Sequence, residues 1–140
     1  MTTANIGLVV EDEWLLRMEM VDELREAGFQ TLEAATGDAA LSLLDSDLKA
    51  DFLVTDIRLP GGADGWTVAE HFHARHPGKP VIYVSANPDL AARRVTGSVF
   101  LGKPCDMRQL LETTARLLKS QLLKQGTNRG RADCRGMPHR

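Results

Sequence analysis

The chain has 140 residues, 43% of them hydrophobic and 26% charged, with a net charge of −2, which suits a single globular domain with its own core. No apolar run is long enough to cross a bilayer and no signal peptide is visible, so we expect no membrane association and a cytoplasmic location. The only two cysteines, Cys105 and Cys134, exclude a disulfide framework or a cysteine metal cluster.

Charge is distributed unevenly along the chain. Residues 119–140 hold six basic residues and one acidic residue, a net +5, so the rest of the chain carries −7. The stretch beyond Gln125 has almost no side chains to bury. We therefore predict a folded domain over residues 1–120 and a basic, disordered tail over residues 121–140.

Short apolar runs alternate with helical patterns five times along the chain. The runs predict buried strands at residues 6–10, 29–34, 52–56, 80–85 and 98–101. Helical spacing of apolar residues follows each run: residues 14–27, the stretches that begin after Thr36 and Asp64, a short piece at 90–95, and a last helix after Asp106.

The strands are continuous apolar runs, which is typical of a parallel sheet covered by helices on both faces. Right-handed crossovers then give an α/β fold, a doubly wound, five-stranded (βα)5 three-layer sandwich.

Polar side chains follow these strands where each strand ends. Glu11 and Asp12 follow the first, Asp56 ends the third, Ser85 ends the fourth, and Lys103 follows the fifth. Because the carboxyl ends of parallel strands meet at one edge of a sheet, we expect these side chains to converge.

The convergence predicts a specific chemistry. Crowded carboxylates repel unless a cation intervenes, and oxygen ligands of this kind suit Mg²⁺. An aspartate such as Asp56 can attack phosphorus to form an acyl phosphate, a transfer that needs mainly positioning and charge neutralisation. Lys103 and the Ser85 hydroxyl would then contact phosphoryl oxygens. Taken singly, each residue also fits a plainer role as a helix cap, a turn residue or a surface lysine.

Several segments of residues 5–120 together resemble the receiver domains of two-component response regulators. The matching segments are Val9-Val10-Glu11-Asp12-Glu13, Thr55-Asp56-Ile57-Arg58-Leu59-Pro60-Gly61, Asp64-Gly65, Val84-Ser85-Ala86 and Lys103-Pro104.

The resemblance implies a flavodoxin-like fold and phosphotransfer to Asp56 from a sensor histidine kinase or a histidine phosphotransfer protein. It also implies Mg²⁺ held by Glu11, Asp12, Asp56 and the carbonyl of Arg58. Ser85 and Phe100 would form a switch pair, in which the hydroxyl moves toward the phosphoryl group and the ring turns inward. An unidentified downstream protein would bind the switched form.

Two departures from the family pattern stand out. The segment from Ser85 to Lys103 is shorter than usual, so we expect a stunted or distorted fourth helix. The loop at residues 61–63 carries an extra residue. Because no output domain follows in this sequence, we expect a stand-alone receiver.

Two other classes of function remain open at this point. A haloacid-dehalogenase-like phosphatase would also use Asp56 as its nucleophile, but such enzymes need a second aspartate where this chain has Arg58, and they need a cap domain. A regulator that binds nucleic acid through the basic tail would lack the usual interleaved aromatic residues. We therefore expect a signalling domain rather than an enzyme, and no nucleic-acid partner.

Arg58 and Asn87 each lie two residues beyond a site residue, Asp56 and Ser85 respectively. We predict that they control how fast the acyl phosphate is hydrolysed. Cys105 is interpreted as a packing residue rather than a redox sensor.

Overall fold

The computed structural model describes residues 5–86 and 93–136, with side chains described up to residue 122. Its five strands pair in parallel in one sheet with the order β2-β1-β3-β4-β5, which confirms the doubly wound fold. The strands are β1 (Ile6–Val10), β2 (Gln30–Ala34), β3 (Phe52–Asp56), β4 (Val81–Ser85) and β5 (Val99–Gly102). Their bounds agree with the predicted ones to within one residue.

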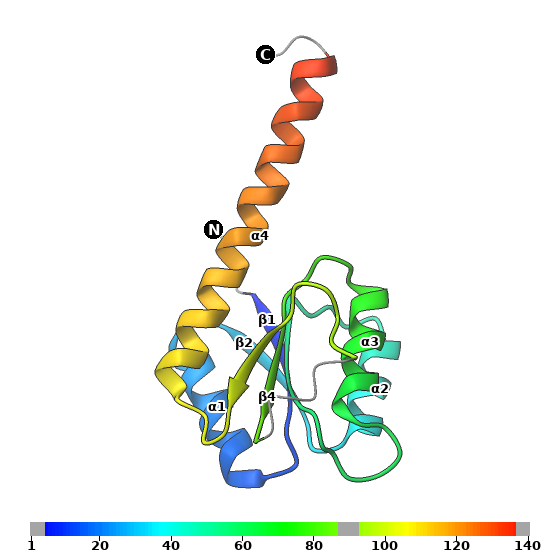
Figure 1. The fold of residues 1–140 in the computed structure, drawn as a ribbon, viewed down its shortest axis with the longest axis vertical. Coiled ribbons are helices and arrows are strands. Elements are labelled where there is room, and N and C mark those ends of the chain that lie inside the picture. The colour runs from blue at the N-terminus through cyan, green and yellow to red at the C-terminus, as the bar shows by residue number, and fades with distance from the viewer. Residues whose placement is uncertain (1–4, 87–92, 137–140) are drawn as a thin grey trace.

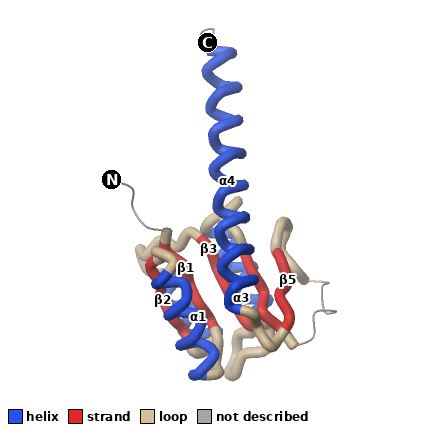
Figure 2. Tube along the Cα trace, turned by 90° about the vertical axis from the view of Figure 1, so that its left-hand side faces the viewer, coloured by secondary structure: helices blue, strands red, loops and turns tan. Residues whose placement is uncertain are grey.

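Helices cover both faces of this sheet. Helices α2 and α3 pack on one face, and α1 and α4 pack on the other, as Figures 1 and 2 show. The bounds are α1 (Trp14–Glu26), α2 (Gly37–Asp45), α3 (Gly65–Arg75) and α4 (Met107–Gly136). No helix in the described part of the chain combines the length and the apolar character that a membrane span requires.

Alternating strand residues supply two separate cores. On β1, Leu8 and Val10 face the α2/α3 side while Val9 faces the α1/α4 side, as expected from the two-residue period of a strand. Both sets are almost completely buried, which explains why the strands read as continuous apolar runs.

The predicted helix caps are present. The Thr36 hydroxyl accepts a hydrogen bond from the Ala39 N–H at 3.0 Å, and the Asp64 carboxylate accepts one from the Thr67 N–H at 2.9 Å. At the start of α4, the Asp106 carboxylate accepts from the Arg108 N–H at 3.0 Å. These caps fix the loops that leave the carboxyl edge of the sheet.

The described end of the connection from β4 to β5 differs from the helical piece predicted at residues 90–95. Residues 93–95 form a turn and irregular backbone, and residues 87–92, which include Asn87, lie outside the described residues. Val95 joins the core on the α2/α3 side. Gly97, with φ of +80°, makes the turn back into β5.

Helix α4 is longer than the sequence analysis predicted. Its backbone continues to Gly136, through most of the segment expected to be a disordered tail, and it projects beyond the body of the molecule in Figure 1. No proline interrupts residues 107–136, and adding residues to an existing helix costs far less than starting one. The division of the chain at residue 120 remains a prediction.

Removing residues 123–140 should change the free energy of unfolding by no more than about 0.5 kcal/mol. Among the α4 side chains that the structure describes, Leu118 is the last one buried in the core, and Leu122 is 66% exposed. Urea denaturation of the two chains measures the difference. A loss of several kcal/mol would show that the projecting part of α4 stabilises the domain.

Candidate functional site

The register of the sheet brings the predicted site residues to one edge. Asp56, the last residue of β3, is paired with Val84, so it lies beside the end of β4. Ser85 is paired with Gly102 of β5, and the Lys103 N–H donates to the Ser85 carbonyl at 3.0 Å. Three strand ends therefore place a carboxylate, a hydroxyl and an ammonium group side by side.

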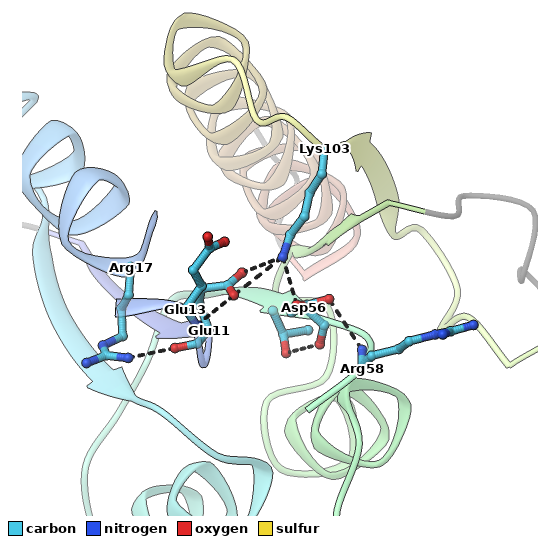
Figure 3. A network of polar contacts seen from close by, with 7 residues as sticks. Glu11, Glu13, Arg17, Asp56, Arg58 and Lys103 are labelled. Carbon is cyan, nitrogen blue, oxygen red and sulfur yellow. Dashed lines mark hydrogen bonds and ion pairs between the residues drawn. The ribbon is translucent and has the colours of Figure 1, made fainter. Parts of the chain in front are cut away.

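Lys103 connects the two carboxylates at the centre of the site. Its Nζ lies 2.9 Å from Asp56 Oδ2 and 3.1 Å from Glu11 Oε1 (Figure 3). Glu11 is fully buried and Asp56 is 8% exposed. An ammonium group this close offsets the repulsion between two carboxylates that water cannot screen.

The backbone around Glu11 is held by hydrogen bonds that the sequence did not reveal. The Glu13 N–H donates to Glu11 Oε2 at 3.0 Å, and the Arg17 guanidinium donates to the Glu11 carbonyl at 2.8 Å (Figure 3). Arg17 lies one turn into α1, so the helix fixes the strand end from which the acidic pair projects.

Carboxylate oxygens of Glu11, Asp12 and Asp56 lie within 4.8 Å of one another. Asp12 is exposed, so the cluster has a buried side and a solvent side. Glu11 Oε1 is buried and accepts no hydrogen bond from the described residues, although it forms the ion pair with Lys103. An oxygen of this kind retains lone pairs for a cation.

A pocket of about 250 Å³ opens beside Asp56 and is lined by Asp56, Arg58, Ser85, Ala86 and Lys103. The Arg58 N–H donates to Asp56 Oδ1 at 3.3 Å, so the backbone of Arg58 borders the carboxylate while its side chain extends outward (Figure 3). The pocket gives a small polar group access to Asp56.

Burial and charge act against each other on the two central ionisable groups. Burial raises the pKa of the Glu11 carboxyl above its ordinary value, although the Glu13 N–H and Lys103 pull that pKa down. Burial alone would lower the pKa of Lys103, but its hydrogen bonds to Asp56 and Glu11 raise it above the ordinary value. Lys103 is therefore charged at neutral pH.

Gly65 packs directly against the backbone of Asp56. Its N–H donates to the Ile57 carbonyl at 2.7 Å, and a Cβ at this position would lie 1.9 Å from the Asp56 carbonyl oxygen. Only a glycine lets α3 begin this close to the end of β3.

The family model of the response regulator receiver domain matches residues 8–115 of this chain. The chain belongs to that family. It is thus a signalling domain of two-component systems, and its fold has the five-stranded parallel arrangement of its structural neighbours.

Known proteins with this domain include kinases and regulators. The chain is 34% identical to the sensor kinase CckA of Brucella abortus over 119 residues, which is 81% of this chain but 12% of that kinase. A response regulator receiver protein from Sinorhizobium medicae has 32% identity and a TM-score of 0.80, covering 84% of this chain and 97% of that one. The receiver domain of the hybrid histidine kinase CckA has 32% identity and a TM-score of 0.71, covering 81% and 99%.

The receiver fold brings Glu11, Asp12, Asp56 and Lys103 together, and it places Ser85 and Arg58 on the pocket. Phe100 lies on β5, where its ring stacks on Tyr83. The roles predicted for these residues remain proposals. Sequence reasoning did not find Arg17 or Tyr83, because nothing in the local pattern shows what a helical arginine or a strand tyrosine will contact.

Cys105 is expected to react slowly with alkylating reagents. Burial raises the pKa of its thiol to about 11, from an ordinary value of 9.0, so the thiolate fraction at pH 8 should fall about a hundredfold. Iodoacetamide labelling followed by peptide mass mapping resolves Cys105 from Cys134, and the urea-unfolded chain provides the reference rate. Equal rates in the folded and unfolded chains would contradict the packing role.

Proposed function

We propose that this receiver domain accepts a phosphoryl group on Asp56. The observation that carries the proposal is the position of Asp56: it ends a buried strand, opens onto a pocket, and has one carboxylate oxygen 2.9 Å from the Lys103 ammonium. A carboxylate nucleophile beside a fixed cation is suited to phosphoryl transfer, which depends mainly on positioning and charge neutralisation.

The donor would be a phosphohistidine of a sensor histidine kinase or a histidine phosphotransfer protein. A carboxylate oxygen of Asp56 forms the new O–P bond as the P–N bond breaks, and the electron pair of that bond stays with the imidazole. Lys103 neutralises charge on the phosphoryl oxygens, and the Ser85 hydroxyl, which lines the same pocket, contacts another of them.

The acidic cluster fits Mg²⁺. The donor set is made only of oxygens, which a hard cation prefers, and the buried Glu11 Oε1 still has lone pairs to offer. Glu11, Asp12, Asp56 and the carbonyl of Arg58 would hold the ion. When bound, it would supply positive charge close to the transferred group.

Phosphorylation would change what the domain binds. The phosphoryl group brings about two negative charges and strong acceptor oxygens, enough to bias a two-state arrangement of nearby loops. Ser85 and Phe100 would form the switch pair, and a downstream protein would recognise the switched state. The proposed place of action is the cytoplasm.

Intact-mass spectrometry after treatment with acetyl phosphate and Mg²⁺ tests the proposal. We expect a gain of one phosphoryl group that is absent in Asp56→Asn and is suppressed by EDTA. The same gain in Asp56→Asn would place the acceptor elsewhere. Steady turnover of a phosphomonoester such as p-nitrophenyl phosphate would instead favour the phosphatase alternative.

Arg58→Ala is expected to speed hydrolysis of the acyl phosphate several-fold. Arg58 is exposed and lines the mouth of the pocket, so truncating it opens a path for water to the phosphorus. The decay of the phosphorylated mass after removal of acetyl phosphate gives the half-life. An unaltered half-life would remove this role from Arg58.

A further inference from the structure

Three aromatic rings, called here the aromatic stack, pack together in the core on the α2/α3 side of the sheet. Phe100 lies on Tyr83 with ring centroids 4.9 Å apart and planes inclined by 27°, and Trp66 lies 5.0 Å from the Tyr83 ring and 6.0 Å from the Phe100 ring. Tyr83 and Ser85 are two residues apart on β4, so their side chains lie on the same face of the sheet. Tyr83 therefore occupies the neighbouring same-face position on β4 to the proposed switch hydroxyl.

Arg94, in the connection between β4 and β5, covers this stack. Its guanidinium carbon lies 4.9 Å from the centroid of the Phe100 ring. The same guanidinium donates to Ser98 Oγ at 3.0 Å and to the Ser98 carbonyl. One side chain thus holds the aromatic ring and the backbone that leads into β5.

A second contact ties the same connection to the sheet. The Val95 N–H donates to the Tyr83 hydroxyl at 3.2 Å, and both residues are buried. The connection is therefore anchored on each of the two stacked rings, through a cation on Phe100 and a hydrogen bond on Tyr83. A change of the Phe100 rotamer would break the contact of its ring with Arg94.

We propose that Arg94 is a positioning residue of the switch, which holds the partly buried Phe100 ring against Tyr83 and Trp66. The inference rests on the proposed function, in which Ser85 and Phe100 form the switch pair. A cation over a partly exposed ring shifts such an equilibrium by about two- to fivefold. Arg94 therefore favours the arrangement that accepts the phosphoryl group before any phosphoryl group arrives.

The test uses Trp66 as the reporter. The chain has two tryptophans, Trp14 and Trp66, so a Trp14→Phe background leaves only the one in the stack. In that background Arg94→Met, which keeps the length and removes the charge, should shift Trp66 emission to the red and increase its quenching by acrylamide. Phosphoryl uptake from acetyl phosphate should slow by about two- to fivefold.

Two control variants separate positioning from general stability. Arg94→Lys keeps a cation over the ring and should restore most of both signals. Arg93→Met removes the neighbouring arginine, whose ion pairs run to Glu70 at 2.9 Å and Asp64 at 3.5 Å, and should leave both signals unchanged.

The outcomes distinguish this inference from the proposed function. Trp66 emission and phosphoryl uptake at wild-type levels in Arg94→Met would overturn the inference. An equal change of both signals in Arg93→Met would overturn it as well. If the parent protein takes up no phosphoryl group, the proposed function fails, while the emission and quenching of Trp66 still decide whether Arg94 holds the stack.

Discussion

Replacing Lys103 with methionine is expected to slow phosphoryl uptake about a hundredfold, the usual cost of removing one charge-stabilising donor from a transition state. Lys103 Nζ contacts both Asp56 and Glu11. Among the described residues, no other cationic group forms an ion pair with either carboxylate. Methionine keeps the length of the side chain and removes the charge. The rate of mass gain with acetyl phosphate and Mg²⁺ measures the effect.

The same variant should lose stability in a pH-dependent way. Without Lys103, the buried Glu11 carboxyl has a still higher pKa in the folded state, so the folded state binds the proton more tightly than the unfolded state does. Stability relative to wild type then rises as pH falls. The difference in free energy of unfolding between wild type and Lys103→Met should be largest at neutral pH. It should become smaller as the pH falls toward 4.5, the ordinary pKa of glutamate.

Lys79→Met is the matched control for Lys103→Met. Lys79 lies 3.6 Å from Asp51, both side chains are about 30% exposed, and neither lines the Asp56 pocket. Replacing Lys79 should leave phosphoryl uptake unchanged and lower the free energy of unfolding by no more than about 1 kcal/mol. Wild-type uptake in Lys103→Met would remove the lysine from the proposed chemistry.

Gly65→Ala is expected to destabilise the domain by about 3 kcal/mol, at the upper end for overpacking. The new Cβ would lie 1.9 Å from the Asp56 carbonyl oxygen and 2.6 Å from the Ile57 Cα. Both are backbone atoms, so no side-chain rotation relieves the clash. Because the displaced backbone is that of Asp56, phosphoryl uptake should fall as well.

Gly62→Ala, in the loop that precedes α3, provides the comparison. A Cβ there would lie 3.6 Å from a carboxylate oxygen of Asp38, an ordinary contact. Urea denaturation should show a change within about 0.5 kcal/mol for this variant. If Gly65→Ala is as stable as Gly62→Ala and takes up phosphoryl groups normally, the close approach of α3 to β3 does not constrain the site.

The sequence was most informative where one residue determines a local structure. Thr36 and Asp64 were predicted as caps, and their side chains accept the expected backbone hydrogen bonds. The convergence of Asp56 and Lys103 was also predictable, because parallel strands present their carboxyl ends at one edge. The combined motif then supported the receiver family, which the family match confirmed.

Prediction failed where a structure depends on several segments at once. The stack of Trp66, Tyr83 and Phe100 requires the register between β4 and β5 and the position of α3, which no local pattern encodes. Of the helical piece expected at residues 90–95, only residues 93–95 are described, and they form a turn and irregular backbone held by contacts of Arg94 and Val95. The backbone of α4 continues to Gly136, beyond the residue 120 boundary expected from the polar composition of the tail, and that division of the chain stays a prediction.

The contacts of Lys103 join parts of the chain that are 47 and 92 residues apart. No fragment that lacks β1 or β5 can assemble this group of side chains, and contacts of such long range form slowly. The proposed phosphoacceptor site therefore cannot be complete in a nascent chain until the segment after Gly102 has emerged. Phosphoryl uptake at the proposed site would then report that β1, β3 and β5 have all joined the sheet.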